Sequence, residues 1–202
     1  ASIYEDSSKE LWIGSWEEGL HHVKTDGTIE IFEYDAKNPY SISSNFVRAC
    51  CEDNLGNIWI GTFNGLNRYD KSTGLFQNHT ASDAQSDGLT HSSIWCIVKD
   101  NQGTLWLGTY FGGVNYFNPE YEIYSRYMYS PIEKKGLSNP VVGRTIEDKD
   151  GNLWIGTEGG GLNYYNRRTR EFKWFRPEIG PNSISPVSYT HLRAHETRGN
   201  LV

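Results

Sequence analysis

Few side chains in this sequence have the types and spacing that covalent chemistry requires. The sequence contains no G-x-S-x-G elbow, P-loop, H-E-x-x-H helix or C-x-x-C pair. His191 and His195 have the i, i+4 spacing of a metal-binding pair, but two histidines in this order are too few for a site. Gly159, Gly160 and Gly161 precede a strand-like segment rather than a helix, which indicates a turn and not a phosphate cradle. We therefore expect no catalytic residue, no metal and no cofactor.

An acidic segment at residues 148–151 offers one further ion-binding candidate. Its Asp-Lys-Asp-Gly order resembles the start of a calcium loop, but the later oxygen ligands of such a loop are missing. The same place reads Asp-Asn-Leu-Gly at 53–56 and Asp-Asn-Gln-Gly at 100–103. Aspartate and glycine at these positions favour tight turns, so we interpret all three segments as structural.

Four tryptophans show that the chain is built from repeats. They lie in the motifs LWIGS at 11–15, IWIGT at 58–62, LWLGT at 105–109 and LWIGT at 153–157. The separations between Trp12, Trp59, Trp106 and Trp154 are 47, 47 and 48 residues. A period of about 40–50 residues suits propeller blades. We expect each tryptophan to pack between neighbouring units rather than to contact a ligand.

Each repeat predicts four short strands. The first is apolar, at 46–52, 94–99 and 141–147; the tryptophan strand is second, and a Gly-Leu or Gly-Val strand is third. The outer strands are expected at 29–34, 75–79, 121–129 and 171–176. One such sheet cannot cover both of its faces alone, so the sheets must pack face to face around an axis. The predicted fold is an all-β propeller, as a partial ring or open arc of about four blades with four antiparallel strands each.

Composition agrees with this class and excludes others. Aromatic residues make up 14% of the chain and there are 21 glycines, which is typical of β-structure with tight turns. The formal net charge of −6 argues against a nucleic-acid partner. No segment approaches the ~18 consecutive apolar residues of a membrane span.

The three cysteines do not form an even framework. Cys50 and Cys51 are adjacent and would point to opposite faces of one strand. We interpret them and Cys96 as small buried residues. A bridge from Cys96 to either neighbour stays open, and with it the redox compartment.

The repeat resembles a known family at specific residues. Ser-Asn-Pro-Val at 138–141, Glu-Asp at 147–148, Leu-Trp-Ile-Gly-Thr at 153–157 and Gly-Gly-Leu-Asn at 160–163 resemble the two-component regulator propeller repeat. The resemblance covers roughly residues 3–185. It implies the periplasmic sensor region of a Bacteroidetes hybrid two-component histidine kinase. It further implies a non-catalytic segment that responds to glycan-derived oligosaccharides, within a parent protein that is a homodimer.

The resemblance also sets expected boundaries. Residues 1–185 form the four repeats, and residues 186–202 are expected to be a non-family tail, disordered or artefactual, because no new inner strand follows Ser185. Four repeats are few for the family, so a fragment of a larger ring, with further blades of the parent chain as partners, is favoured over an open arc or a tight four-bladed closure. Such a fragment would expose an apolar face at each end and self-associate.

Strand directions predict where a ligand would bind. The loop between the second and third strands lies at the same end as the start of the next inner strand, and propellers commonly bind ligands at one such rim. Aromatic faces pack on sugar C–H groups, and charged or amide groups bond hydroxyls. The predicted ligand-binding residues are Trp16, Glu17, Arg48, Phe63, Asn64, Trp95, Tyr110, Phe111, Arg144 and Glu158.

Two other functions stay open. A propeller scaffold for protein partners would expose an apolar patch on one rim. A propeller polysaccharide lyase or glycosidase would need an acid/base pair, for which Glu17, Glu18 and Glu158 are the rim carboxylates.

Overall fold

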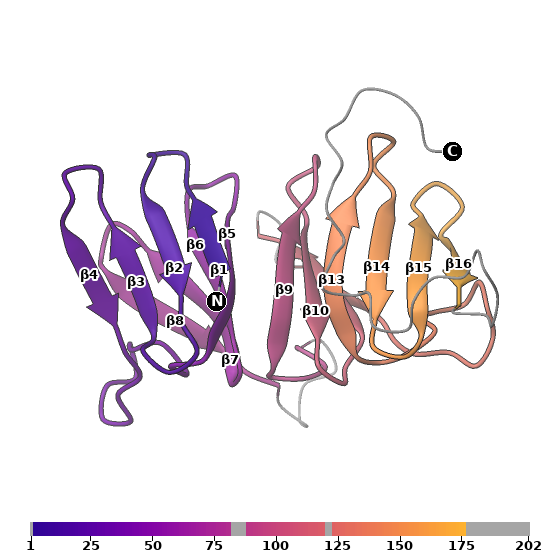
Figure 1. The fold of residues 1–202 in the computed structure, drawn as a ribbon, viewed down its shortest axis with the longest axis horizontal. Coiled ribbons are helices and arrows are strands. Elements are labelled where there is room, and N and C mark those ends of the chain that lie inside the picture. The colour runs from indigo at the N-terminus through magenta and orange to yellow at the C-terminus, as the bar shows by residue number, and fades with distance from the viewer. Residues whose placement is uncertain (1, 82–87, 120–122, 177–202) are drawn as a thin grey trace, which may run out of the picture.

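The computed structural model describes residues 2–81, 88–119 and 123–176. Within these ranges there are sixteen strands and no helix, and the strands form four separate sheets (Figure 1). No helix in the described ranges is therefore long and apolar enough to cross a membrane. The predicted tail at 186–202 lies outside the described residues.

The strands follow the predicted repeat closely. The first sheet contains β1 (Ser2–Glu5), β2 (Leu11–Gly14), β3 (Leu20–Val23) and β4 (Ile29–Phe32). The second contains β5 (Val47–Glu52), β6 (Ile58–Thr62), β7 (Gly65–Asp70) and β8 (Leu75–His79). The third contains β9 (Ile94–Lys99), β10 (Leu105–Thr109), β11 (Val114–Asn118) and β12 (Ile123–Tyr127). The fourth contains β13 (Val142–Glu147), β14 (Leu153–Thr157), β15 (Gly161–Asn166) and β16 (Glu171–Phe175).

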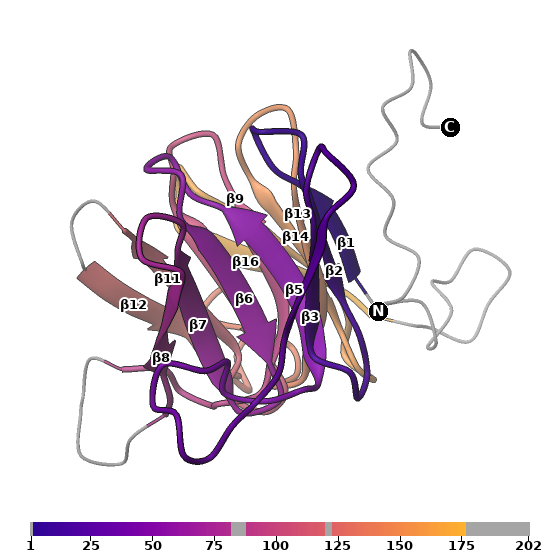
Figure 2. The same cartoon turned by 90° about the vertical axis from the view of Figure 1, so that its left-hand side faces the viewer.

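Each sheet is an antiparallel meander in chain order, and the four sheets pack side by side. The first strand of each sheet contacts the first strand of the next, so β1, β5, β9 and β13 form the inner edge. Figures 1 and 2 show the sheets following one another along an arc, with the first and fourth at its two ends. This arrangement is the four-bladed partial propeller that the repeats predict.

An aspartate closes the turn before each tryptophan strand and also bonds the tryptophan. Asp53 Oδ1 accepts the backbone N–H groups of Leu55 and Asn57, each at 2.9 Å. Its Oδ2 accepts the indole N–H of Trp59 at 2.7 Å. The same six-residue spacing joins Asp6 to Trp12 at 2.9 Å, Asp100 to Trp106 at 2.6 Å and Asp148 to Trp154 at 3.2 Å. The acidic turn and the tryptophan therefore form one structural unit.

The last residue of this turn needs a left-handed backbone. Gly56 adopts a φ of 83° there, and the equivalent glycines of the third and fourth sheets have the same sign of φ. In the first sheet the position is Lys9, at a φ of 66°. The aspartate of that turn keeps its bonds, so the first repeat tolerates a side chain where the others have none.

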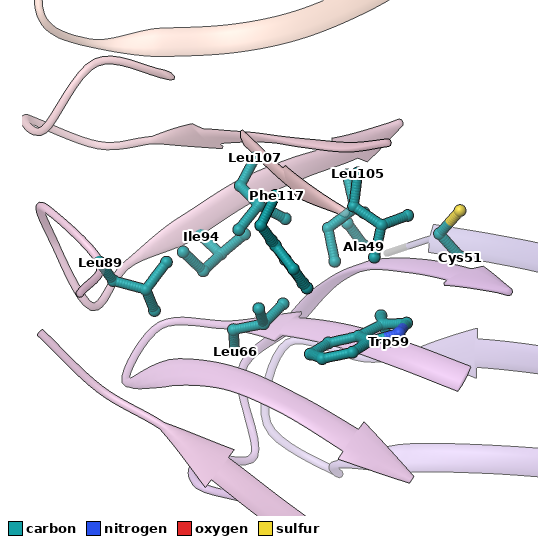
Figure 3. Packing of buried hydrophobic residues seen from close by; sticks show 10 residues of the cluster. Ala49, Cys51, Trp59, Leu66, Leu89, Ile94, Leu105, Leu107 and Phe117 are labelled. Atoms are coloured by element: carbon teal, nitrogen blue, oxygen red, sulfur yellow. The ribbon is translucent and has the colours of Figure 1, made fainter. Parts of the chain in front are cut away.

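The cores lie between neighbouring sheets, and the tryptophans of the first three sheets each pack against the sheet that follows. Trp12 contacts Tyr69 of the second sheet at 5.3 Å between ring centroids. Trp59 contacts Phe117 of the third sheet edge-to-face at 4.9 Å, in the cluster of Figure 3. Trp106 meets Tyr165 of the fourth sheet at 6.0 Å. The expected packing of tryptophans between units is confirmed for these three interfaces.

A glycine two residues after the tryptophan lets neighbouring sheets approach. A Cβ added to Gly61 would lie 2.7 Å from Cγ2 of Ile94, on the inner strand of the third sheet. That separation is far inside van der Waals contact, so any side chain would push the two sheets apart. The W-I-G-T motif thus places the large tryptophan ring and a glycine, which has no side chain, on the same face of the strand.

Two of the three interfaces carry a partly buried charged cluster where the inner strands end, which we call the charged corner. Between the first and second sheets, Lys71 Nζ contacts Asp6 Oδ2 at 2.9 Å and Glu52 Oε1 at 3.3 Å. Glu52 Oε2 also accepts the backbone N–H of Ser7 at 2.7 Å. The second charged corner, between the third and fourth sheets, joins Arg167 to Asp100 and Glu147.

All three cysteines are buried and free, as the interpretation of small core residues expects. Cys50 lies in the core between the first and second sheets, and Cys51 lies in the next core, so the adjacent residues do face opposite sides of β5. Burial raises the pKa of Cys50 to about 12 and that of Cys51 to about 11. Thiols held this strongly in the protonated form are poor nucleophiles.

A candidate binding rim

The predicted rim is held together by backbone hydrogen bonds. In the second, third and fourth sheets, the loop after the tryptophan strand is hydrogen-bonded to the start of the inner strand of the same sheet. Phe63 N–H donates to Phe46 O, Tyr110 N–H to Ser93 O and Glu158 N–H to Val141 O, all at 3.0 Å. A further bond joins successive sheets, because Val47 N–H donates to Ser15 O at 2.9 Å. Loops and strand starts from neighbouring sheets therefore meet at one end of the arc, as the strand directions predict.

Irregular pairing at the start of two inner strands determines how their side chains are presented. Val47 pairs with Thr62 and Ala49 with Gly61, so Arg48 is left out of the β5–β6 ladder as a bulge. Trp95 is left out of the β9–β10 ladder in the same way. A bulge of this kind redirects a side chain at a sheet edge. The two bulged residues come from adjacent sheets and lie next to each other.

The two bulged side chains complete a continuous stack of three aromatic rings and one guanidinium group. The Arg48 guanidinium lies 4.5 Å from the ring centroid of Trp16 and 4.1 Å from that of Trp95. Trp95 in turn stacks on Tyr110, with centroids 5.1 Å apart and planes 9° apart. We call Trp16, Arg48, Trp95 and Tyr110 the rim stack. It spans the first three sheets, and each cation–π contact contributes about 0.5–2 kcal/mol.

Exposed rings extend the rim stack on both sides. Phe46 lies between Trp16 and Phe63, at centroid distances of 5.9 and 6.2 Å. Tyr110 contacts Phe111 edge-on at 4.3 Å. Trp16, Phe63 and Phe111 are 58, 55 and 54% exposed. An aromatic surface of this extent, carried on short loops, is the kind of surface that packs against sugar rings or apolar side chains of a partner.

The rim stack also contains a polar group that is not satisfied. The indole Nε1 of Trp95 is buried and has no hydrogen-bond partner in the described part of the chain. A buried N–H donor that forms no hydrogen bond lowers the stability of the fold by about 1–3 kcal/mol.

The remaining predicted residues lie apart from the rim stack or contribute less to it. Arg144 is not the counterpart of Arg48, because Gly143 occupies the bulge of β13 and Arg144 pairs with Gly156 on the exposed face of the fourth sheet. Glu17 and Asn64 are exposed in the same loops as Trp16 and Phe63. Glu158 is exposed in the loop of the fourth sheet.

Sequence reasoning missed two rim residues. Phe46 connects the exposed rings of the first and second sheets, and His91 lies 6.4 Å from Tyr110 and 6.2 Å from Phe111 between centroids. Both stand just before an inner strand, in the segment that the Ser-Asn signal of the repeat marks. The described residues contain no group of three or more His, Cys, Asp or Glu side chains that could hold a metal.

Comparison with known proteins places the chain among propellers. Its fold matches the extracellular domain named as part of hybrid two component system BT4673 from B. thetaiotaomicron, with 25% identity and a TM-score of 0.70 over 85% of this chain and 24% of that one. The corresponding domain of BT3049 from the same organism matches at 22% identity and a TM-score of 0.69, over 85% and 22% of the two chains. The chain thus spans about a quarter of these relatives' length.

A third match shows the fold alone. Virginiamycin B lyase from Staphylococcus aureus has 13% identity and a TM-score of 0.65, over 89% of this chain and 56% of the lyase. No curated protein sequence matches the chain. The family model described as "Two component regulator propeller" matches residues 41–64, 88–111 and 136–159, each of which runs from before an inner strand to the loop after the tryptophan strand. Three segments of this chain therefore match the repeat of the two component regulator propeller family.

Proposed function

We propose that this chain is part of the extracytoplasmic sensor region of a hybrid two-component system, and that it binds ligand without covalent chemistry. The family match and the likeness to extracellular domains of such systems support the sensor assignment. In this proposal the parent protein is a periplasm-facing histidine kinase that acts as a homodimer, with further blades beside this segment. A ligand would shift its signalling equilibrium through unequal affinity for two conformations.

We further propose that the ligand is an oligosaccharide bound at the rim stack. The single observation that carries this proposal is the row of rings and guanidinium that joins Trp16, Arg48 and Trp95. Exposed aromatic faces beside it offer packing surfaces for the C–H groups of sugar rings. Because the stack spans three sheets, a ligand on it would tie those sheets together.

Calorimetric titration with a panel of plant and host oligosaccharides tests the proposal. We expect at least one glycan to bind, and we expect Trp95→Ala and Tyr110→Ala to weaken that binding by about tenfold or more. Leu55→Ala is the matched control, because Leu55 is exposed in the turn at the opposite end of the second sheet. Equal binding by the parent and both rim variants would contradict the site, and no binding by any glycan would contradict the ligand class.

A protein partner is the second candidate, because three large rings are exposed along one rim. It predicts that the same variants lose capture of a partner while no glycan stabilises the chain against heat. Product formation from a polysaccharide, lost in Glu158→Gln, would instead support a lyase or glycosidase.

A further inference from the structure

The three interfaces between neighbouring sheets can be compared position by position, because the sheets repeat. At the rim, two of them carry a backbone hydrogen bond from the glycine that begins the third strand to the segment that enters the next sheet. Gly19 N–H donates to Asn45 O at 3.1 Å between the first and second sheets. Gly113 N–H donates to Pro140 O at 3.0 Å between the third and fourth sheets.

The middle interface, between the second and third sheets, lacks this bond. The equivalent residues there are Gly65 and Ser92, both within the described part of the chain, and no hydrogen bond joins their backbones. Gly65 follows its tryptophan by six residues, whereas Gly19 and Gly113 follow theirs by seven. Its φ is 148°, compared with 74° and 73° for the other two glycines. The shorter loop thus leaves this rim contact unmade.

The other end of the middle interface lacks the charged corner. At the two charged corners, the glutamate that ends an inner strand accepts a backbone N–H from the turn of the preceding sheet. Glu52 accepts from Ser7 at 2.7 Å, and Glu147 accepts from Asn101 at 3.0 Å. In the third sheet this position is Lys99. An ammonium group has no acceptor atom, so it cannot form the equivalent bond.

Apolar packing and the rim stack remain at the middle interface. Trp59 is buried against Phe117, and the inner strands β5 and β9 lie side by side. At the rim, the Arg48 guanidinium of the second sheet lies 4.1 Å from the ring centroid of Trp95 in the third. Apolar contacts are non-directional, whereas hydrogen bonds fix an angle. Among the described residues, the middle interface therefore has the fewest interactions that fix the orientation of one sheet against the next.

We propose that the middle interface is a hinge, about which the chain moves as two halves of two sheets each, and that the contact between Arg48 and Trp95 is the latch that closes it at the rim. A rim backbone bond and a charged corner hold each half together internally. The hinge rests on the contacts between sheets alone. A molecule bound along the rim stack would hold the two halves in one orientation, and this use of the hinge rests on the proposed function.

Pairs of spin labels at equivalent turn positions test the hinge. Ser8, Leu55, Gln102 and Asp150 are all exposed, and each lies two residues after the turn aspartate of its own sheet. The double variants Ser8→Cys/Leu55→Cys, Leu55→Cys/Gln102→Cys and Gln102→Cys/Asp150→Cys each place two labels across one interface. The three native thiols are buried and their pKa values are raised, so labelling favours the introduced cysteines.

Electron paramagnetic resonance then measures the distribution of distances between the two labels. We expect the pair across the middle interface to show a wider distribution than either of the other pairs. Three distributions of equal width overturn the hinge. No glycan is present in these measurements, so failure of the hinge is distinguishable from failure of the proposed function.

Two substitutions at the middle interface test the latch and the cause of the hinge. We expect Arg48→Ala to widen the distribution across the middle interface and to leave that between the third and fourth sheets unchanged. Glu17→Ala, at an exposed rim position outside the rim stack, is the matched control. Lys99→Glu with Pro119→Lys supplies the groups of a charged corner, and we expect it to narrow the middle distribution.

Each variant has an outcome that contradicts its part of the proposal. A middle distribution that Arg48→Ala leaves unchanged overturns the latch. One that the Lys99→Glu/Pro119→Lys variant leaves unchanged overturns the explanation of the hinge by the missing charged corner. Far-UV circular dichroism checks that the labelled variants fold as the parent does.

Discussion

The interface between the first and second sheets and the interface between the second and third share a core but differ where the inner strands end. In both, a tryptophan bonded to its own turn aspartate is buried against the next sheet. The first interface adds the charged corner of Asp6, Glu52 and Lys71. In the second, Lys99 occupies the glutamate position and Pro119 occupies the cation position.

The difference shows which part of the interface is essential. Apolar packing with the aspartate–tryptophan unit is present at every contact between sheets, whereas the charged corner is present at two of the three. Buried ion pairs often contribute little net stability, because desolvation offsets their attraction. We infer that the charged corner fixes the relative placement of two sheets more than it holds them together.

The largest expected effect comes from removing an aspartate at a charged corner. Asp100→Ala removes the acceptor of the Trp106 indole and of two turn N–H groups, and it leaves Arg167 without its nearest buried partner. We expect a loss of about 3–5 kcal/mol, the range for breaking a buried ion pair, with Glu147 left as the remaining partner of Arg167. Asp53→Ala removes the same turn and indole bonds where no charged corner exists, and we expect about 1–3 kcal/mol. Equal losses in urea denaturation would contradict the comparison.

A tryptophan inside the arc should matter more than the one at its end. Trp59→Ala empties the core shared by the second and third sheets, and we expect it to lower the free energy of unfolding by about 3–5 kcal/mol. Trp154→Ala removes a half-buried ring from the outer face, and we expect at most about 1–2 kcal/mol at concentrations where the chain is monomeric. Chemical denaturation of the two variants side by side measures the contrast.

Asp6 in the first charged corner and Glu147 in the second should respond to acid in opposite directions. Burial acts to raise the pKa of Asp6, but hydrogen bonds from Lys71 and Trp12 outweigh it and hold the pKa below the ordinary value of 3.8. The stability from this carboxylate is therefore present above pH 3.8 and lost as the pH falls through the lowered value. Burial chiefly raises the pKa of Glu147 above 4.5, so its contribution is present at acid pH and lost as the pH rises.

Denaturation of Asp6→Asn and Glu147→Gln between about pH 3 and pH 7 measures these opposite slopes, because each carboxyl group changes its proton occupancy on folding in the opposite direction. We expect the advantage of the parent over Asp6→Asn to shrink as the pH falls. The advantage over Glu147→Gln should instead shrink as the pH rises. Parallel pH profiles for the two variants would show that the corners do not differ in this way.

The smallest effect should come from transferring the charged corner to the middle interface. Lys99→Glu with Pro119→Lys would place a carboxylate and a cation near Asp53, and we expect a gain of about 0.5–1 kcal/mol for the double variant. Lys99→Glu alone adds a carboxylate near Asp53 without a cation and should destabilise the chain slightly. A double-mutant cycle measures the coupling, and a coupling of zero would show that the positions are not equivalent in space.

The strand boundaries could be predicted almost to the residue, because each repeat contains local signals that mark where its strands begin and end. An apolar strand, an Asp-x-x-Gly turn and a W-I-G-T strand are local signals, and the structure begins and ends these strands within one or two residues of the predicted ranges in most repeats. The aspartate–tryptophan bond was missed, although the constant spacing of six residues was present in the sequence. The charged corners could not be found, since they join residues far apart in the chain, such as Asp6 and Lys71.

The rim was predicted in part, for a related reason. Loop position places Trp16, Arg48, Trp95 and Tyr110 at one end, but the stacking order of the rings and the guanidinium depends on two bulges. The bulge also explains the misplacement of Arg144. Arg48 and Trp95 each lie eleven residues before the tryptophan of their own sheet, and in the fourth sheet that position is Gly143, so Arg144 lies one residue past the bulge.

The bond between aspartate and tryptophan within each turn has a consequence for how such chains grow. Its two partners lie six residues apart, so both are copied together whenever a gene segment of one repeat is duplicated. The copied sheet also inherits one face that inserts a tryptophan and an opposite face that receives one. A tandem duplication therefore creates a matched junction at once, and unequal recombination can lengthen or shorten the array without new compensating substitutions.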